Sequence, residues 1–294
     1  MVYLQSASLP TEGMEFSVLL AEKRTYVHSA YPFKIFPQMG LHKIDFDGIT
    51  MFYGGNGSGK STLINVLARK MDAVRYSAFN DSQLFERYTQ LCNVRCTSRP
   101  KKCYVLSSDD VFDYVLNARY VNDDIDERRK ALLDQYVSAH HEVRSNAEIM
   151  RMKGMDDYER WNTTMEILSK KHTQSSFIKK RVERDVDLRS NGESAMHYFL
   201  ERIGEDGLYF LDEPENSLSV EFQCQLAEFI VATARASRCQ FVIATHSPIL
   251  LSMVNARIYN LDGDPASVCE WTELPNVRKL YDFFMEHDAA FRNG

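Results

Sequence analysis

A glycine-rich run in the first third of the chain has the residue types and spacing that bind phosphate. Its members are Gly54, Gly55, Asn56, Gly57, Ser58, Gly59, Lys60 and Ser61. They fit the P-loop pattern G-x-x-x-x-G-K-[ST], in which backbone N–H groups converge on phosphate at the start of a helix. Lys60 is expected to reach the β- and γ-phosphates, the hydroxyl of Ser61 to bind Mg²⁺, and Thr62 to complete the nucleotide contacts. The sequence therefore predicts a site for a nucleoside triphosphate.

A pair of adjacent carboxylates, Asp212 and Glu213, follows the wholly apolar run Leu208–Leu211. A run of this kind predicts a buried strand, and at its carboxyl end both side chains can address one ligand. We expect Asp212 to hold Mg²⁺, as in a Walker B motif, and Glu213 to polarise the attacking water.

A histidine follows the next apolar run, Gln240–Ala244, in the tetrapeptide Thr245-His246-Ser247-Pro248. Since this run ends near the same sheet edge as Leu208–Leu211, His246 is expected to contact the γ-phosphate and so to distinguish ATP from ADP. A second phosphate cradle, with Ser190 and Gly192, is predicted where the helix at 195–200 begins. One chain does not need two cradles, but a dimer that shares its nucleotides does.

The elements that must position these residues fall into three stretches. Residues 1–108 contain short apolar runs at 16–20, 31–36 and 44–48. The last two are expected to be strands leading into the predicted P-loop strand at 49–53, with one long helix after it. Residues 109–189, with a single glycine and no proline, predict a helical insert. Residues 190–294 return to strands and helices, including an amphipathic helix at 220–236 and a strand at 257–261. Continuous apolar strands separated by helices predict an α/β fold with a mostly parallel sheet covered on both faces.

The motifs, in this order and spacing, resemble the ABC-class ATPases. The P-loop, the Ser190–Glu193 segment, the run from Phe210 to Ser219 and Ala244–Pro248 carry the resemblance. The chain is similar to the soluble, non-transporter AAA-family ATPases related to the SMC and DNA-repair heads. This resemblance implies a single ABC-type P-loop domain with an N-terminal β lobe, a helical insert and bound ATP and Mg²⁺.

The resemblance also implies an ATP-dependent homodimer. Ser190 and Gly192 would contact the γ-phosphate held by the partner subunit, and the D-loop at 215–218, with Ser217 as a nucleotide contact, would cross the interface. The glutamine that the family places after the strand near residue 106 has no counterpart. Asp109 or Asp110 stands in that region, and Asp110 is expected to bind Mg²⁺ in its place.

Composition describes a globular protein of 294 residues, with 44% hydrophobic and 26% charged residues. No apolar run is long enough to span a bilayer, and the first residues lack the pattern of a secretory signal, so we expect a cytoplasmic protein with no membrane partner. The six cysteines are scattered and are expected to be free thiols. The formal net charge of −6 does not favour nucleic acid, although the stretch 170–189 has seven basic residues.

The main hypothesis is an ATPase head that dimerises around ATP and Mg²⁺, hydrolyses ATP and couples the nucleotide state to a protein effector. One alternative is a regulatory ATP switch that controls a toxin or nuclease in a bacterial defence system. Another is an SMC-like ATPase that clamps DNA through the basic stretch. A small-molecule kinase is disfavoured, because kinases of that kind need no histidine for the γ-phosphate after a second strand.

Overall fold

The computed structural model describes residues 2–21, 30–79, 81, 84–117 and 191–292. The chain divides into two compact units, one formed by residues 1–113 with 190–294 and the other by residues 114–189. Of the expected helical insert, only its beginning, a helical stretch at residues 108–117, is among the described residues. The basic stretch at 170–189 lies outside them. The fold below is that of the first unit.

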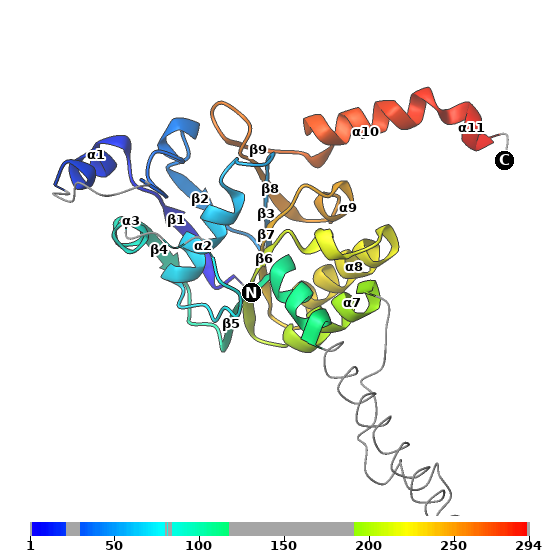
Figure 1. The fold of residues 1–294 in the computed structure, drawn as a ribbon, viewed down its shortest axis with the longest axis horizontal. Helices are drawn as coiled ribbons and strands as arrows, with labels where there is room; N and C mark the ends of the chain where they lie inside the picture. Colours follow the sequence, from blue (N-terminus) through cyan, green and yellow to red (C-terminus); the bar gives the residue numbers. More distant parts are fainter. Residues whose placement is uncertain (1, 22–29, 80, 82–83, 118–190, 293–294) are drawn as a thin grey trace, which may run out of the picture. The chain divides into compact units, whose positions relative to one another are not determined.

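A six-stranded sheet forms the centre of this unit, with the strand order β5-β6-β7-β3-β8-β9 (Figure 1). Its strands are β3 (Ile49–Tyr53), β5 (Lys102–Ser107), β6 (Gly207–Asp212), β7 (Gln240–Ala244), β8 (Ala256–Asn260) and β9 (Ser267–Cys269). The first five pair in parallel, and only β9 is antiparallel to its neighbour. Every residue of β3, β6 and β7 is buried, which agrees with their continuous apolar sequences. The predicted α/β fold with a mostly parallel sheet is confirmed.

A smaller antiparallel sheet forms the N-terminal lobe. It consists of β1 (Leu4–Ser8), β2 (Lys43–Asp45) and β4 (Asn93–Cys96) in the order β2-β1-β4. The side chain of Gln240, at the start of β7, ties the two sheets together. Its amide oxygen accepts hydrogen bonds from the backbone N–H groups of Tyr3 and Leu4, and its amide nitrogen donates to the carbonyl oxygens of Leu4 and Asp47.

The strand expected at 31–36 is wrong, because Pro32 has no N–H group to donate to a strand ladder and the segment turns instead. Residues 16–20 belong to helix α1 (Glu12–Ala21), and residues 31–36 form turns. The third run, at 44–48, contributes to β2. The carboxylate of Glu15 in α1 is buried and accepts a hydrogen bond of 2.6 Å from the backbone N–H of Lys34, which ties the helix to the turn region.

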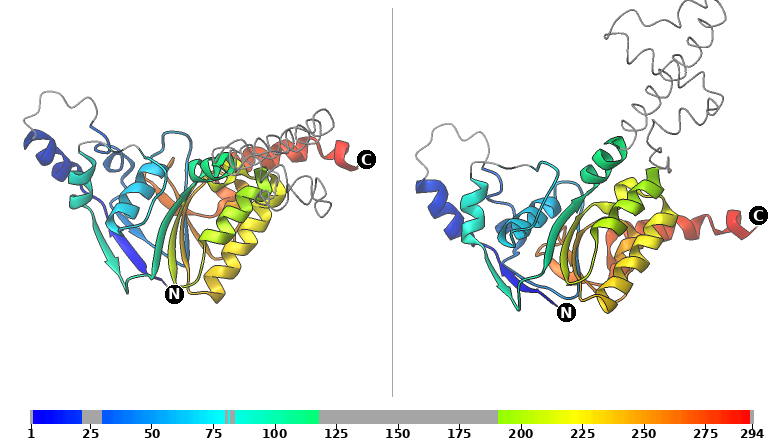
Figure 2. Two further views of the ribbon diagram at one scale, coloured as in Figure 1. Left: turned by 60° about the horizontal axis from the view of Figure 1, so that its bottom comes forward. Right: turned by 90° about the horizontal axis from the view of Figure 1, so that it is seen from below.

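Helices cover both faces of the central sheet (Figure 2). Helix α2 (Lys60–Lys70) and the antiparallel sheet lie against one face, and α7 (Asn191–Arg202) and α8 (Val220–Ala236) lie against the other. The strand residues Phe52, Phe210 and Val242 belong to the core on the side of α2. The remaining helices are α3 (Phe85–Leu91), α9 (Pro248–Leu251), α10 (Pro275–Glu286) and α11 (Asp288–Arg292), with short 3-10 turns η1 (Pro37–Met39), η4 (Pro214–Ser217) and η5 (Trp271–Glu273).

Two further expectations concern membrane spans and thiols. In the described ranges, every helix is too short or too polar to cross a membrane. All six cysteines are free, as expected.

Candidate nucleotide site

The P-loop lies between the end of β3 and the start of α2, as the sequence predicts. Gly57 and Gly59 have φ values of 84° and 85°, a backbone conformation that side chains with a Cβ atom rarely adopt. A Cβ atom on Gly59 would lie 2.9 Å from Cγ2 of Ile35. The glycines are therefore required by the shape of the turn and by the close approach of its neighbours.

The loop surrounds a cavity of about 230 Å³. Ile35, residues 56–62 and Glu213 line it. The hydroxyl oxygen of Ser58 is buried against Gly54, where an added Cβ atom would lie 2.3 Å from it, and it has no hydrogen-bond partner among the described residues. The cavity lies at the start of α2, where backbone N–H groups without a helical partner and the ammonium group of Lys60 favour an anion. The loop thus fits the phosphates of a nucleotide.

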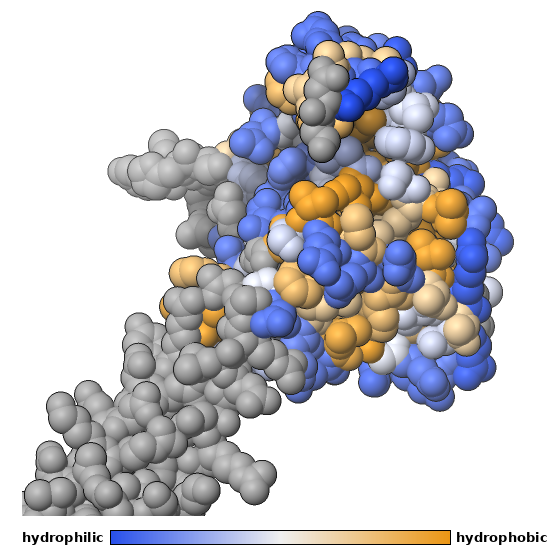
Figure 3. Space-filling model, turned by 90° about the vertical axis from the view of Figure 1, so that its right-hand side faces the viewer, coloured by the Kyte–Doolittle hydropathy of each residue, from blue (hydrophilic) through white to orange (hydrophobic). Residues whose placement is uncertain are grey.

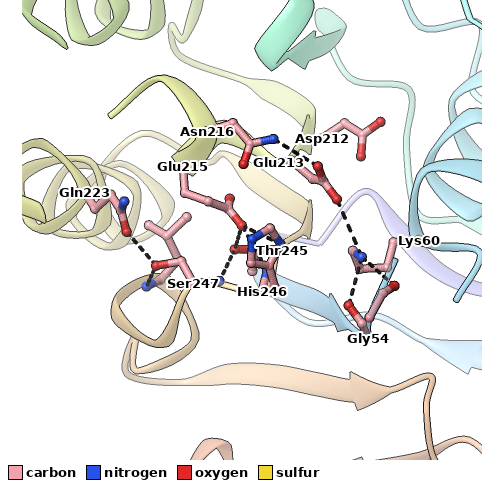
Figure 4. Close-up of polar contacts among 12 residues, drawn as sticks. Gly54, Lys60, Asp212, Glu213, Glu215, Asn216, Gln223, Thr245, His246 and Ser247 are labelled. Atoms are coloured by element: carbon pink, nitrogen blue, oxygen red, sulfur yellow. Dashed lines mark hydrogen bonds and ion pairs between the residues drawn. The ribbon is translucent and has the colours of Figure 1, made fainter. Parts of the chain in front are cut away.

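Lys60 is buried and lines this cavity, and Figure 4 shows its Nζ beside Gly54 and Glu213. Its Nζ donates hydrogen bonds to the carbonyl oxygens of Gly54 and Gly55, at 2.8 and 3.1 Å, and lies 3.5 Å from Oε1 of Glu213. The contact joins the end of β3 to the end of β6, two strands separated by β7 in the sheet. The predicted lysine and the predicted general base therefore meet at one edge of the sheet.

The two residues expected to hold Mg²⁺, Ser61 and Asp212, are also neighbours. The hydroxyl of Ser61 donates a hydrogen bond of 2.9 Å to Oδ1 of Asp212. Burial raises the pKa of Asp212 to about 6, although the Ser61 hydrogen bond and the positive charges of Arg75 and Lys60 act in the opposite direction. A hydroxyl and a carboxylate are oxygen ligands of the kind that Mg²⁺ prefers, so this pair fits the ion.

Glu213 has a left-handed backbone conformation, with φ 49° and ψ 51°. This conformation is costly for a residue other than glycine and tends to occur at functional sites. It turns the chain sharply into η4, and there the side-chain amide of Asn216 donates a hydrogen bond of 3.0 Å to Oε2 of Glu213. The two oxygens of Glu213 therefore face different groups, Oε2 the Asn216 amide and Oε1 the lysine.

His246 follows β7, and its side chain is 43% exposed. Its backbone N–H donates a hydrogen bond of 2.9 Å to Oε1 of Glu215, and its Nδ1 lies 3.4 Å from the same oxygen. Thr245 donates to that oxygen as well, at 2.7 Å (Figure 4). Since β7 lies between β6 and β3, the histidine leaves the sheet between the Glu213 turn and the P-loop.

The second cradle is described only in part. Ser190 lies outside the described residues, and the side chain of Ser217 is not described. Gly192, in the first turn of α7, packs closely against α8, since a Cβ atom there would lie 2.7 Å from Cδ2 of Phe222. Close helix packing is thus a sufficient reason for this glycine within one chain.

The hydrogen bonds of the Asp110 carboxylate differ from those expected of an Mg²⁺ ligand. Its Oδ2 accepts hydrogen bonds from the backbone N–H and the hydroxyl of Ser107, and its Oδ1 accepts one from the backbone N–H of Ser77, each of 2.8 Å. The backbone N–H of Asp110 in turn donates to the Ser107 hydroxyl. This reciprocal pattern is a capping box at the helix that follows β5. Both oxygens of the buried carboxylate thus accept hydrogen bonds, one from Ser77 and the other from Ser107 of the cap.

Two residues near the site have no part in the sequence motifs. Asp262, just beyond β8, accepts hydrogen bonds from the backbone N–H of Gly55 with both carboxylate oxygens, at 2.8 and 3.1 Å. Arg75 lowers the pKa of Asp212 through its charge and donates to the side chain of Asn65 in α2. Asp262 follows a strand of the same parallel sheet, which is the signal that could have identified it. Nothing in the sequence around Arg75 indicates its place.

Comparison with solved structures finds SMC head domains and an ABC transporter among the matches. The SMC head domain from Thermotoga maritima is 14% identical, with 91% of this chain and 98% of that chain covered and a TM-score of 0.39. The Smc head from Pyrococcus furiosus, solved with the C-terminal domain of ScpA, is 12% identical, with 96% and 100% covered and a TM-score of 0.42. A putative metal-chelate type ABC transporter is 18% identical, with 80% and 78% covered and a TM-score of 0.35.

The comparison with protein families gives a firmer result. No curated protein shows significant similarity to the chain. One family model, described as "AAA domain, putative AbiEii toxin, Type IV TA system", matches residues 100–252. This range contains β5, β6 and β7 with Asp212, Glu213 and His246, and it spans just over half of the chain. The chain therefore belongs to this family of AAA domains.

Proposed function

We propose that the chain binds ATP with Mg²⁺ and hydrolyses it. The observation that carries the proposal is the meeting of Lys60, Ser61, Asp212 and Glu213 at one sheet edge, beside a cavity lined by the P-loop. Lys60 and Ser61 begin the helix that follows β3, whereas Asp212 ends β6 and Glu213 follows it. Since β3 and β6 are not neighbours in the sheet, only the fold brings these residues together. Structural ion pairs alone would not explain a buried lysine beside two carboxylates at the edge of a cavity lined by backbone N–H groups.

Each residue has a distinct task in this proposal. The P-loop amides and Lys60 bind and orient the triphosphate, and the charge of Lys60 balances the charge that develops on it. Ser61 and Asp212 would hold Mg²⁺, which neutralises phosphate charge when bound. Glu213 accepts a hydrogen bond from the attacking water and orients it, and His246 contacts the γ-phosphate.

We further propose that two copies of the chain complete each site, with Ser190, Gly192 and Ser217 acting across the interface. In this arrangement residues 1–108 and 190–294 form one ATPase domain, interrupted by a helical insert at 109–189. An apolar surface supports the idea of an interface. Hydrophobic residues gather on the side of the molecule where α8 and α9 lie (Figure 3), and Val220 and Val254, near the ends of these helices, are 68% and 57% exposed.

Two measurements test the proposal: ATP hydrolysis and the size of the protein in gel filtration. Wild-type protein should release phosphate from ATP and Mg²⁺, whereas Lys60→Ala should not. Glu213→Gln should bind ATP without hydrolysing it and elute from gel filtration as a dimer with ATP, but not with ADP. Glu86→Gln, an exposed substitution on α3, is the matched control and should behave as wild type. Hydrolysis that survives in Lys60→Ala would exclude the proposed site, and a Glu213→Gln variant that stays monomeric with ATP would exclude the shared arrangement.

A second candidate is a regulatory switch, in which ATP-driven dimerisation rather than phosphate release is the output to a protein effector. The family description, which names a toxin of a type IV toxin–antitoxin system, favours this reading. It predicts very slow turnover with tight ATP binding. A pull-down with ATP-bound Glu213→Gln would identify the effector, and rapid multiple turnover by the isolated protein would argue against a switch.

A further inference from the structure

Glu215 lies two residues after the proposed general base and points towards the neighbouring strand end. It belongs to η4, the turn that follows β6, and it is 6% exposed. Its Oε1 accepts one hydrogen bond from the Thr245 hydroxyl and one from the His246 backbone N–H, at 2.7 and 2.9 Å. The side chain thus bridges the ends of β6 and β7 (Figure 4).

A buried carboxylate is a costly way to make this bridge. Oε2 of Glu215 is buried and has no hydrogen-bond partner within the described part of the chain. An ionised group taken out of water costs free energy unless partners satisfy both of its oxygens. A glutamine could accept the same two hydrogen bonds without burying a charge. The charge therefore needs another explanation, and the ring of His246 offers one, since its Nδ1 lies 3.4 Å from Oε1.

We propose that Glu215 is a positioning residue for His246. This role rests on the proposed function, in which His246 contacts the γ-phosphate. The carboxylate fixes the histidine backbone through the N–H group and favours a proton on Nδ1, which leaves Nε2 to face the substrate. The other side of the segment is held as well, because the Ser247 hydroxyl donates a hydrogen bond of 2.7 Å to the side chain of Gln223 on α8.

The same turn also holds the general base. Asn216, the residue after Glu215, donates its hydrogen bond to Glu213, whereas Glu215 accepts those of Thr245 and His246. Consecutive residues of η4 thus hold the water-orienting carboxylate on one side and the phosphate-contacting histidine on the other. A displacement of this short turn would move both groups together, so Glu215 links the two halves of the proposed machinery.

A double-mutant cycle in ATP hydrolysis tests the proposal. Glu215→Ala should lower kcat by about 10² with KM changed less than about twofold, since misplacing a group by about 1 Å costs rates of that order. Glu215→Gln keeps the acceptor oxygen and should retain more activity than Glu215→Ala. In a His246→Ala background, Glu215→Ala should lower kcat by less than about twofold, because the group through which it acts is already absent. Effects that multiply in the double variant would overturn the positioning role.

A second measurement needs no hydrolysis. The chain has 8 histidines, and in protein labelled with ¹³C at histidine Cε1 the His246 resonance is identified by its loss in His246→Ala. This resonance should shift in Glu215→Gln and stay unchanged in the control Glu86→Gln. If wild-type protein hydrolysed no ATP, the proposed function would fall while this readout still reported on the contact. An unshifted His246 resonance in folded Glu215→Gln would overturn the inference.

Discussion

Replacement of Asp212 by asparagine should make the nucleotide-free protein more stable while it removes activity. Burial raises the pKa of this carboxyl from 3.8 to about 6, so the folded chain at neutral pH holds an ionised group in an unfavourable place. A pKa raised from 3.8 to about 6 corresponds to about 3 kcal/mol of lost stability at neutral pH. Asparagine keeps an oxygen to accept the Ser61 hydrogen bond and carries no charge. We therefore expect a gain of up to about 3 kcal/mol at pH 8.

The pH dependence gives this prediction its sign. Below the unfolded pKa of 3.8, Asp212 is protonated in both states and costs nothing. Between 3.8 and about 6 the unfolded chain ionises first, so the folded state of the wild type loses stability as the pH rises. Above about 6 the full penalty is present. The advantage of Asp212→Asn should thus be near zero at pH 4 and largest at pH 7 and above.

Thermal or urea unfolding in EDTA, from pH 4 to pH 8, measures the effect. A gain of about 3 kcal/mol corresponds to roughly 6–12 °C in Tm for a chain of this size. Asp282→Asn, an exposed substitution on α10, is the control and should change stability by less than about 0.5 kcal/mol. Equal stabilities of Asp212→Asn and wild type at pH 8, or a difference that does not change with pH, would refute the reasoning.

Two further predictions concern the backbone around the site. Gly59→Ala should weaken ATP binding and cost about 1–3 kcal/mol of stability, because φ is 85° and the new methyl group would press on Ile35; Gly13→Ala in α1, where a Cβ meets nothing within 4 Å, should not destabilise the protein. Ser219→Ala should cost about 1 kcal/mol in urea unfolding, since the Ser219 hydroxyl accepts the hydrogen bond of Phe222 N–H at the start of α8. A Gly59→Ala variant with wild-type ATP affinity, or a Ser219→Ala variant of unchanged stability, would contradict them.

The strands that carry the site could be predicted because their sequences are short, apolar throughout and followed by polar residues. In a parallel sheet the carboxyl ends of such strands lie at one edge. This rule alone brings Lys60, Glu213 and His246 near one another. The same rule applied to the strand at 257–261 points to Asp262, which contacts Gly55.

Side-chain contacts between loops could not be predicted from the sequence. The sequence places Glu215 in the loop after the strand that ends at Asp212. Only the structure shows that its carboxylate contacts Thr245 and His246. The role of Asp110 could have been predicted, because Ser107 and Asp110 have the S-x-x-D spacing of a capping box. The apolar run at 16–20 was ambiguous between helix and strand, as short apolar runs are.

The specific ATPase activity at different protein concentrations tests the shared site most directly. Phosphate release per subunit should be low at nanomolar protein and rise to a plateau as dimers form around ATP and Mg²⁺, and Glu213→Gln should remain inactive throughout. Activity per subunit that stays constant from nanomolar to micromolar protein would contradict the shared site, and the absence of any hydrolysis above the Lys60→Ala background would contradict the proposed ATPase itself.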